Sequence, residues 1–73
     1  MNAKWLSERL PRTGRVLGGE HAGAEAIFEP EDRDATAWHI YIKGGSRDAA
    51  YDIWADDAEQ VVHWIENWRI ELD

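Results

Sequence analysis

The chain has 73 residues, 8 lysines and arginines against 15 aspartates and glutamates, a formal net charge of −7, and no cysteine. A chain of this length forms at most one domain, and without cysteine it can have neither disulfides nor a thiolate metal site. Its 5 tryptophans supply large apolar side chains for a core that must stabilise the fold alone. No apolar run suits a signal peptide or a membrane span, so we expect a soluble cytoplasmic protein.

The charge is unevenly distributed along the chain. Residues 1–15 carry four basic side chains and one carboxylate, a net charge of +3, whereas residues 16–73 carry four basic side chains and fourteen carboxylates, a net charge of −10. A body this acidic repels the phosphates of nucleic acid and attracts basic protein surfaces. The same charge also serves solubility, and composition does not separate these two roles.

The N-terminal segment, residues 1–14, predicts either a short helix or an extended basic arm. Asn2 is suited to cap a helix that ends before Pro11, but so few residues stay helical only when the helix docks on the rest of the protein. The connector that follows is rich in glycine. Val16 and Leu17 predict a short edge strand within it.

Residues 15–54 predict an antiparallel sheet. Residues 24–29 alternate small and large side chains and stop at a proline, which favours a strand. Residues 36–43 give the clearest strand pattern, and the glycine pair after them favours a hairpin to a partner strand at residues 49–54.

Alternation assigns the side chains of the last two strands to faces. In the first, one face holds Trp38, Ile40 and Ile42, and the other holds His39, Tyr41 and Lys43. In the second, Tyr51 and Ile53 share one face, and Asp52 and Trp54 share the other.

Residues 56–72 predict a C-terminal amphipathic helix. Asp56 is suited to cap it by accepting a hydrogen bond from the amide of Glu59. The apolar stripe has helical spacing and consists of Val61, Trp64, Ile65, Trp68 and Leu72. We therefore predict one α+β domain over residues 1–73, in which three or four antiparallel strands are covered on one face by this helix.

The core is expected to contain Trp38, Ile40, Ile42, Val61, Trp64, Ile65 and Trp68. Trp54 is the exception, because it shares a strand face with Asp52 beside the acidic start of the helix. Two interpretations stay open for Trp54. It either closes the end of the core or is exposed to a partner.

Residue patterns for catalysis or metal binding are weak. The histidines His21, His39 and His63 have no ligand spacing, and adjacent carboxylates such as Asp56 and Asp57 are typical of a helix start. We expect no enzymatic activity, no metal and no cofactor. His39, Tyr41 and Lys43 hint at a stacking platform for RNA, but the acidic body favours a solvated sheet face, so no direct nucleic-acid binding is expected.

Binding to a basic protein surface is the function that remains. One group of candidate contact residues lies in the turn after the proline-terminated strand and consists of Glu29, Glu31, Asp32 and Asp34. A second group surrounds Trp54 and the start of the helix and consists of Asp52, Asp56, Asp57 and Glu59. Carboxylates steer the encounter, and an aromatic ring supplies contact area. Solvation around Pro30 is the alternative role of the first group.

The size, the acidity, the strand–hairpin–strand segment over residues 24–54 and the following helix resemble the small acidic phage-encoded inhibitors, among them several anti-CRISPR proteins. The resemblance covers roughly residues 24–72 and is one of shape, charge and size. It implies direct binding to a CRISPR effector complex, in which carboxylates occupy a nucleic-acid groove in place of phosphates. We expect a monomer or weak homodimer. One alternative is a toxin-neutralising immunity protein. The other is a structural or regulatory module that self-associates or serves as a subunit of a larger assembly, with the Trp-rich helix as its interface.

Overall fold

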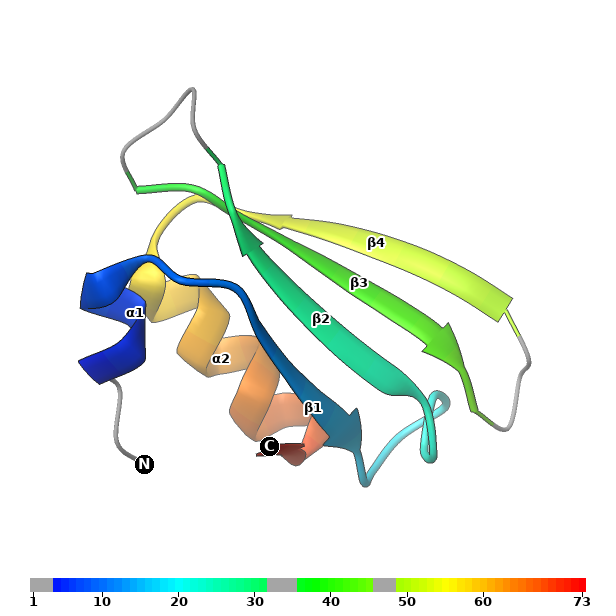
Figure 1. Ribbon diagram of the computed structural model, residues 1–73. Coiled ribbons are helices and arrows are strands. Elements are labelled where there is room, and N and C mark those ends of the chain that lie inside the picture. The colour runs from blue at the N-terminus through cyan, green and yellow to red at the C-terminus, as the bar shows by residue number, and fades with distance from the viewer. Residues whose placement is uncertain (1–3, 32–35, 46–48) are drawn as a thin grey trace.

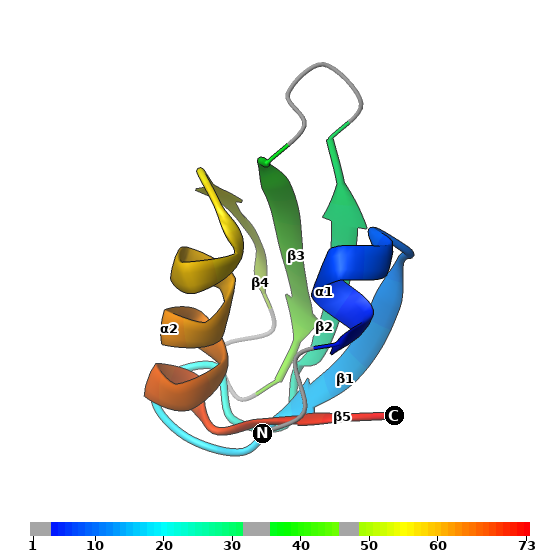
Figure 2. The same cartoon turned by 90° about the vertical axis from the view of Figure 1, so that its left-hand side faces the viewer.

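The computed structural model describes residues 4–31, 36–45 and 49–73. A five-stranded antiparallel sheet carries both helices on one face (Figures 1 and 2), which confirms the α+β class with five strands instead of three or four. In chain order the elements are α1 (Lys4–Glu8), β1 (Arg12–Val16), β2 (Glu25–Pro30), β3 (Trp38–Gly44), β4 (Ala49–Ala55), α2 (Ala58–Trp68) and β5 (Ile70–Leu72). The strands lie in the order β4-β3-β2-β1-β5. No helix among the described residues is long and apolar enough to cross a membrane.

Strand alternation assigns the faces of the sheet as the sequence predicts. Trp38, Ile40 and Ile42 of β3 are buried on the face that carries the helices, while His39 and Tyr41 between them are only partly covered. In β4 the same register places Tyr51 and Ile53 opposite Ile42 and Ile40, on the helix-bearing face. Asp52 and Trp54 therefore lie on the other face, which we call the outer face.

The N-terminal segment is docked on the core. Trp5 of α1 packs edge-on against Phe28 and Trp38, with ring centroids 5.6 and 5.5 Å apart. The Arg12 guanidinium lies over Trp5 at 5.7 Å, and that of Arg9 lies over Trp38 at 5.4 Å. Arg9 also donates to the backbone carbonyls of Glu31 and Ala37 at 2.9 and 3.1 Å. The segment is thus a docked helix and strand, and these two arginines act within the fold.

The C-terminal helix is shorter than predicted. It ends at Trp68, Arg69 adopts a left-handed conformation with φ 50° and ψ 57°, and the chain continues as β5 beside β1. Ile70, Glu71 and Leu72 fit both patterns, because Leu72 continues the helical stripe while the three residues also alternate as a strand. Pairing with the free edge of β1 satisfies backbone groups and buries Ile70. The prediction of a helix to residue 72 is therefore wrong.

The cap of α2 is Asp57 and not Asp56. The carboxylate of Asp57 accepts from the backbone N–H of Gln60 at 3.0 Å, and the Gln60 side-chain oxygen accepts from the backbone N–H of Asp56 at 3.0 Å. The sequence holds two overlapping capping patterns, Asp56 with Glu59 and Asp57 with Gln60. Glutamine serves at the third helical position as glutamate does, so the pattern alone leaves a one-residue ambiguity.

Most of the residues predicted for the core are buried there. Trp38, Val61 and Ile65 are buried together with the β3 isoleucines, whereas Trp64 and Trp68 are only partly buried and pack against the side of the core. Both α2 tryptophans contribute to the core as predicted, but at its border and less completely buried than Trp38. In the core Trp5 packs against Phe28 and Trp38, whereas Trp68 packs against His21 and Tyr51 at its side.

Candidate functional site: the outer face of the sheet

Neither described helix covers the outer face, since α1 and α2 both contribute to the core on the other side (Figure 2). Strand register orders its side chains in three rows across the sheet. The first row is Trp54, His39 and Glu29. The second is Asp52, Tyr41, Ile27 and Thr13. The third is Ala50, Lys43, Glu25, Arg15 and Glu71.

The first two rows bring together an aromatic and acidic cluster, which consists of His39, Tyr41, Asp52 and Trp54. The His39 and Tyr41 rings stack with centroids 4.4 Å apart, and Trp54 meets His39 edge-on at 6.1 Å. Trp54 is 47% exposed, one of the most exposed large apolar side chains among the described residues. Trp54 therefore does not close the end of the core, because its side chain points away from it, and its contact with a partner stays a prediction.

Hydrogen bonds order this cluster. His39 Nε2 lies 3.0 Å from the carboxylate of Asp52, and the Tyr41 hydroxyl lies 3.3 Å from His39 Nδ1. An ionised carboxylate only accepts, so in the neutral imidazole Nε2 donates to Asp52 and Nδ1 accepts from Tyr41. The indole Nε1 of Trp54 donates to Asp56 at 3.0 Å. The exposed indole is therefore held in one orientation beside two carboxylates, Asp52 and Asp56.

Charge differs between the two ends of the outer face. In the first two rows, taken over their described members, the formal charges are the carboxylates of Glu29 and Asp52. In the third row Lys43, Glu25, Arg15 and Glu71 alternate in sign across neighbouring strands. Opposite charges in direct cross-strand register attract each other. The cluster end is thus the acidic end of this face.

The structure brings only some of the predicted contact residues together. Asp52 and Trp54 meet on the outer face, and Asp56 joins them through the indole bond. Asp57 lies apart, because it lines a groove of about 390 Å³ with Leu6, Ser7, Arg9, Thr36, Trp38 and Ala58 on the helix-bearing side. Glu59 is exposed two residues before Val61, which places it on the side of α2 remote from the core.

The turn group is divided in the same way. Glu29 lies on the outer face opposite His39, and Glu31 follows β2 with its backbone N–H bonded to Ala37. Asp32 and Asp34 lie outside the described residues. The prediction that these carboxylates contact a partner stays a prediction.

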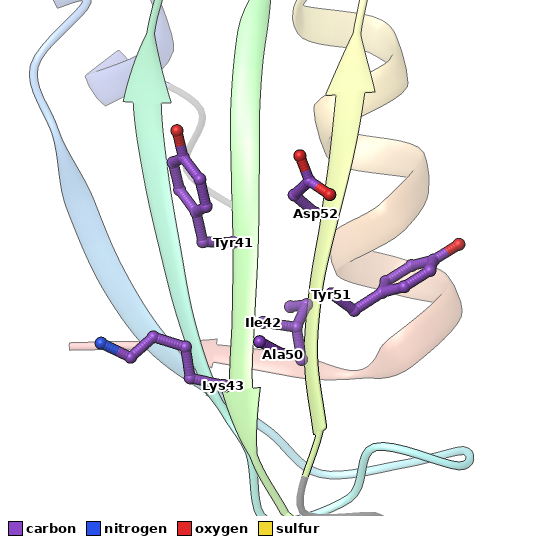
Figure 3. A pocket seen from close by; sticks show the side chains of 6 residues that line it. All are labelled: Tyr41, Ile42, Lys43, Ala50, Tyr51 and Asp52. Atoms are coloured by element: carbon purple, nitrogen blue, oxygen red, sulfur yellow. The ribbon is translucent and has the colours of Figure 1, made fainter.

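A hollow of about 240 Å³ lies beside the cluster, where the small side chain of Ala50 leaves space on the third row. Its lining residues, drawn in Figure 3, are Tyr41, Ile42, Lys43, Ala50, Tyr51 and Asp52. Figure 3 shows Tyr51 pointing toward the side of α2, whereas Tyr41 and Lys43 extend in the opposite direction.

A second hollow, which sequence reasoning missed, lies on the helix-bearing side of β4. We call this space of about 480 Å³ the aromatic cleft, and its lining residues are Gly19, Glu20, His21, Tyr51, Trp64, Asn67 and Trp68. The Tyr51 ring stacks on His21 with centroids 5.4 Å apart and meets Trp68 edge-on with centroids 6.4 Å apart. The ring centroids of Trp64 and Trp68 are 4.9 Å apart. Three distant segments supply these rings, so no local pattern marks the cleft.

Comparisons with models of protein families, with curated proteins and with solved structures found no match. Among the described residues, no group of three or more histidine, aspartate and glutamate side chains is placed to hold a metal ion.

Proposed function

We propose that the chain is a protein-binding inhibitor whose acidic sheet face occupies a basic, nucleic-acid-binding surface of a larger protein. The observation that carries the proposal is the 47% exposed Trp54, held beside Asp52 and Asp56 on the uncovered face of the sheet. Tryptophan is among the residue types enriched at the energetic centres of protein interfaces, and flanking carboxylates steer a basic partner toward it.

Rigid presentation supports this function. Asp52 and Trp54 project from a strand that is paired along its length with β3, and their side chains are bonded to His39 and Asp56. A surface ordered before binding loses little conformational entropy on association. Carboxylates at fixed spacing are what a groove built for phosphates can accept. A CRISPR effector complex is the partner class that the resemblance implies, and a basic toxin would present the same chemistry.

The arginines of the basic N-terminal segment contact other parts of the chain, which favours the acidic remainder of the protein as the contact surface. Arg9 and Arg12 stack on buried rings, and Arg15 donates to the Gly23 carbonyl at 3.1 Å, so all three guanidinium groups make contacts within the fold. Phosphate contacts need such groups to be available. We therefore keep binding to protein, and not to nucleic acid, as the proposal.

The alternative function, a self-associating module, is favoured by one observation. The strand β4 has seven residues and lies at the edge of the sheet, where no described strand pairs with its other side. Unpaired edges of this kind pair readily with another strand.

The experiment compares the proteins that the immobilised chain captures from cell lysate in three forms. These are the wild type, the double variant Asp52→Asn with Trp54→Ala, and the control Glu71→Gln, which removes an exposed carboxylate from the far edge of the same face. Asp57 is spared because it caps α2. We expect the wild type and the control to capture the same basic nucleic-acid-binding protein, which added DNA or RNA displaces, and the double variant to lose it.

Salt provides the second readout. Attraction between exposed charges is screened, so capture by the wild type should weaken between about 50 mM and about 300 mM salt, and the residual capture by the double variant should depend less on salt. The proposal is wrong if the double variant, with unchanged melting, captures the same proteins as the wild type with the same salt dependence.

A further inference from the structure

The two edges of the sheet are protected to different degrees. The β5 edge is three residues long, from Ile70 to Leu72. The β4 edge runs over seven residues, Ala49–Ala55, and holds one charged residue, Asp52, and no proline or lysine. Proteins usually shield a long edge with lysine, proline, a bulge or a covering segment, because its unpaired backbone groups bind other strands. The register of β4 with β3 is continuous and has no bulge.

Aromatic side chains border this edge on both faces. Trp54 is 47% exposed on the outer face, and Tyr51 is 50% exposed on the helix-bearing face. Two hollows adjoin the same strand, with Tyr51 in the lining of both. The hollow at Ala50 is on the outer face (Figure 3). The aromatic cleft is on the other face. A strand added beside β4 would direct alternate side chains to these two faces.

The chemistry around Trp54 and in the aromatic cleft favours a basic occupant, while Lys43 lies across from Ala50 at the other end of β4. Asp52 and Asp56 flank Trp54 on one side, and Glu20 lies with the rings of Tyr51, Trp64 and Trp68 on the other. Carboxylates attract lysine and arginine, and indole and phenol rings bind these cations over their faces. A second copy would instead bring another Asp52 and another net charge of −7 to the same edge.

From these observations we infer that β4 binds an extended basic segment of the partner by strand addition. The segment pairs its backbone with the edge of β4 and directs lysine or arginine side chains alternately toward Trp54 and toward the aromatic cleft. This inference rests on the proposed function and specifies the partner's binding element as an extended lysine- or arginine-bearing strand.

The test uses two synthetic peptides with the full-length chain. One is an eight-residue peptide in which pairs of lysines alternate with pairs of valines, so that lysines lie on both faces of an added strand. The other has the same sequence with every backbone nitrogen methylated. Methylation keeps all charges and side chains but removes the donors that strand pairing needs. We expect the first peptide to bind at least tenfold more tightly and to slow amide hydrogen exchange at alternate residues of β4.

Variants then test the two faces. Tyr51→Ala and Trp54→Ala should each lower the affinity for the unmethylated peptide several-fold. Glu71→Gln, in the opposite edge strand β5, should leave that affinity unchanged. Far-UV circular dichroism of each variant establishes that it is folded, and exchange in the wild type tests the edge without any substitution.

Equal affinity for the two peptides, without protection of β4 amides from exchange, would overturn strand addition. The proposed function is tested separately, by the loss of capture in the Asp52→Asn, Trp54→Ala variant. Protection of β4 that rises with chain concentration in the absence of peptide, together with a dimer in size-exclusion chromatography, would also overturn the inference by identifying a second copy as the occupant.

Discussion

Replacing Gly14 by alanine tests the contact between β1 and β5 that adds the fifth strand. Gly14 pairs with Leu72, and a Cβ atom at position 14 would lie 2.6 Å from the backbone oxygen of Glu71 and 3.0 Å from Ile70 Cγ2. Overpacking of this kind costs about 1–3 kcal/mol. The obstructing atom belongs to the backbone, so a side-chain rotation cannot relieve it.

The expected loss is a large part of the total stability. A 73-residue domain is stable by about 4–11 kcal/mol if each residue contributes about 0.05–0.15 kcal/mol. With a urea dependence of about 1 kcal/mol per molar, the unfolding midpoint of Gly14→Ala should fall by about 1–3 M. Because β5 pairs only with β1, and alternate amides of β5 point toward β1, we also expect faster amide exchange at Glu71 and Asp73.

Gly18→Ala is the matched control. A Cβ atom there would meet nothing closer than the side-chain nitrogen of Arg69 at 3.5 Å, an ordinary contact, and the backbone does not require glycine. Its midpoint should stay within about 1 M of the wild type, since removing a glycine chiefly restricts the unfolded chain. If both variants unfold at the wild-type midpoint and the β5 amides of Gly14→Ala stay protected from exchange, the result would contradict the close packing of β1 against β5.

Two further predictions concern α2 and the tryptophans. Asp57→Ala should lower the free energy of unfolding in urea by about 0.5–2 kcal/mol because it removes the cap to Gln60. Asp56→Ala should lower it less, and the reverse order would place the cap one residue earlier. Trp38→Ala should cost about 3–5 kcal/mol or prevent folding, while Trp64→Ala should cost clearly less because Trp64 is only partly buried. Equal losses in thermal unfolding would contradict the observed difference in burial.

Some features of the fold follow from local patterns in the sequence. The alternation around Ile40 defines β3 and its faces, and the glycines after it predict the hairpin to β4, because strand periodicity and positive φ are properties of neighbouring residues. The helical spacing of Val61 and Ile65 likewise predicts α2 and its buried side. On the outer face, alternation alone places Asp52 beside Trp54, and the structure agrees.

Other features depend on contacts between distant segments. Ile70 to Leu72 form a strand because they meet β1, where Thr13 Oγ1 donates to the carboxylate of Asp73 across 60 residues of sequence at 2.6 Å. The orientation of the indole of Trp54, the docking of the N-terminal arginines and the aromatic cleft at Tyr51 are decided in the same way.

The sequence by itself therefore determines the class of the fold, the sidedness of its strands and the acidity of its surface. The fifth strand, the position of β4 at an edge of the described sheet and the partners of Trp54 are decided by the tertiary structure. The physical reason is that a short segment such as Ile70 to Leu72 suits both helix and strand, and only the free backbone groups of β1 make one of the two more stable.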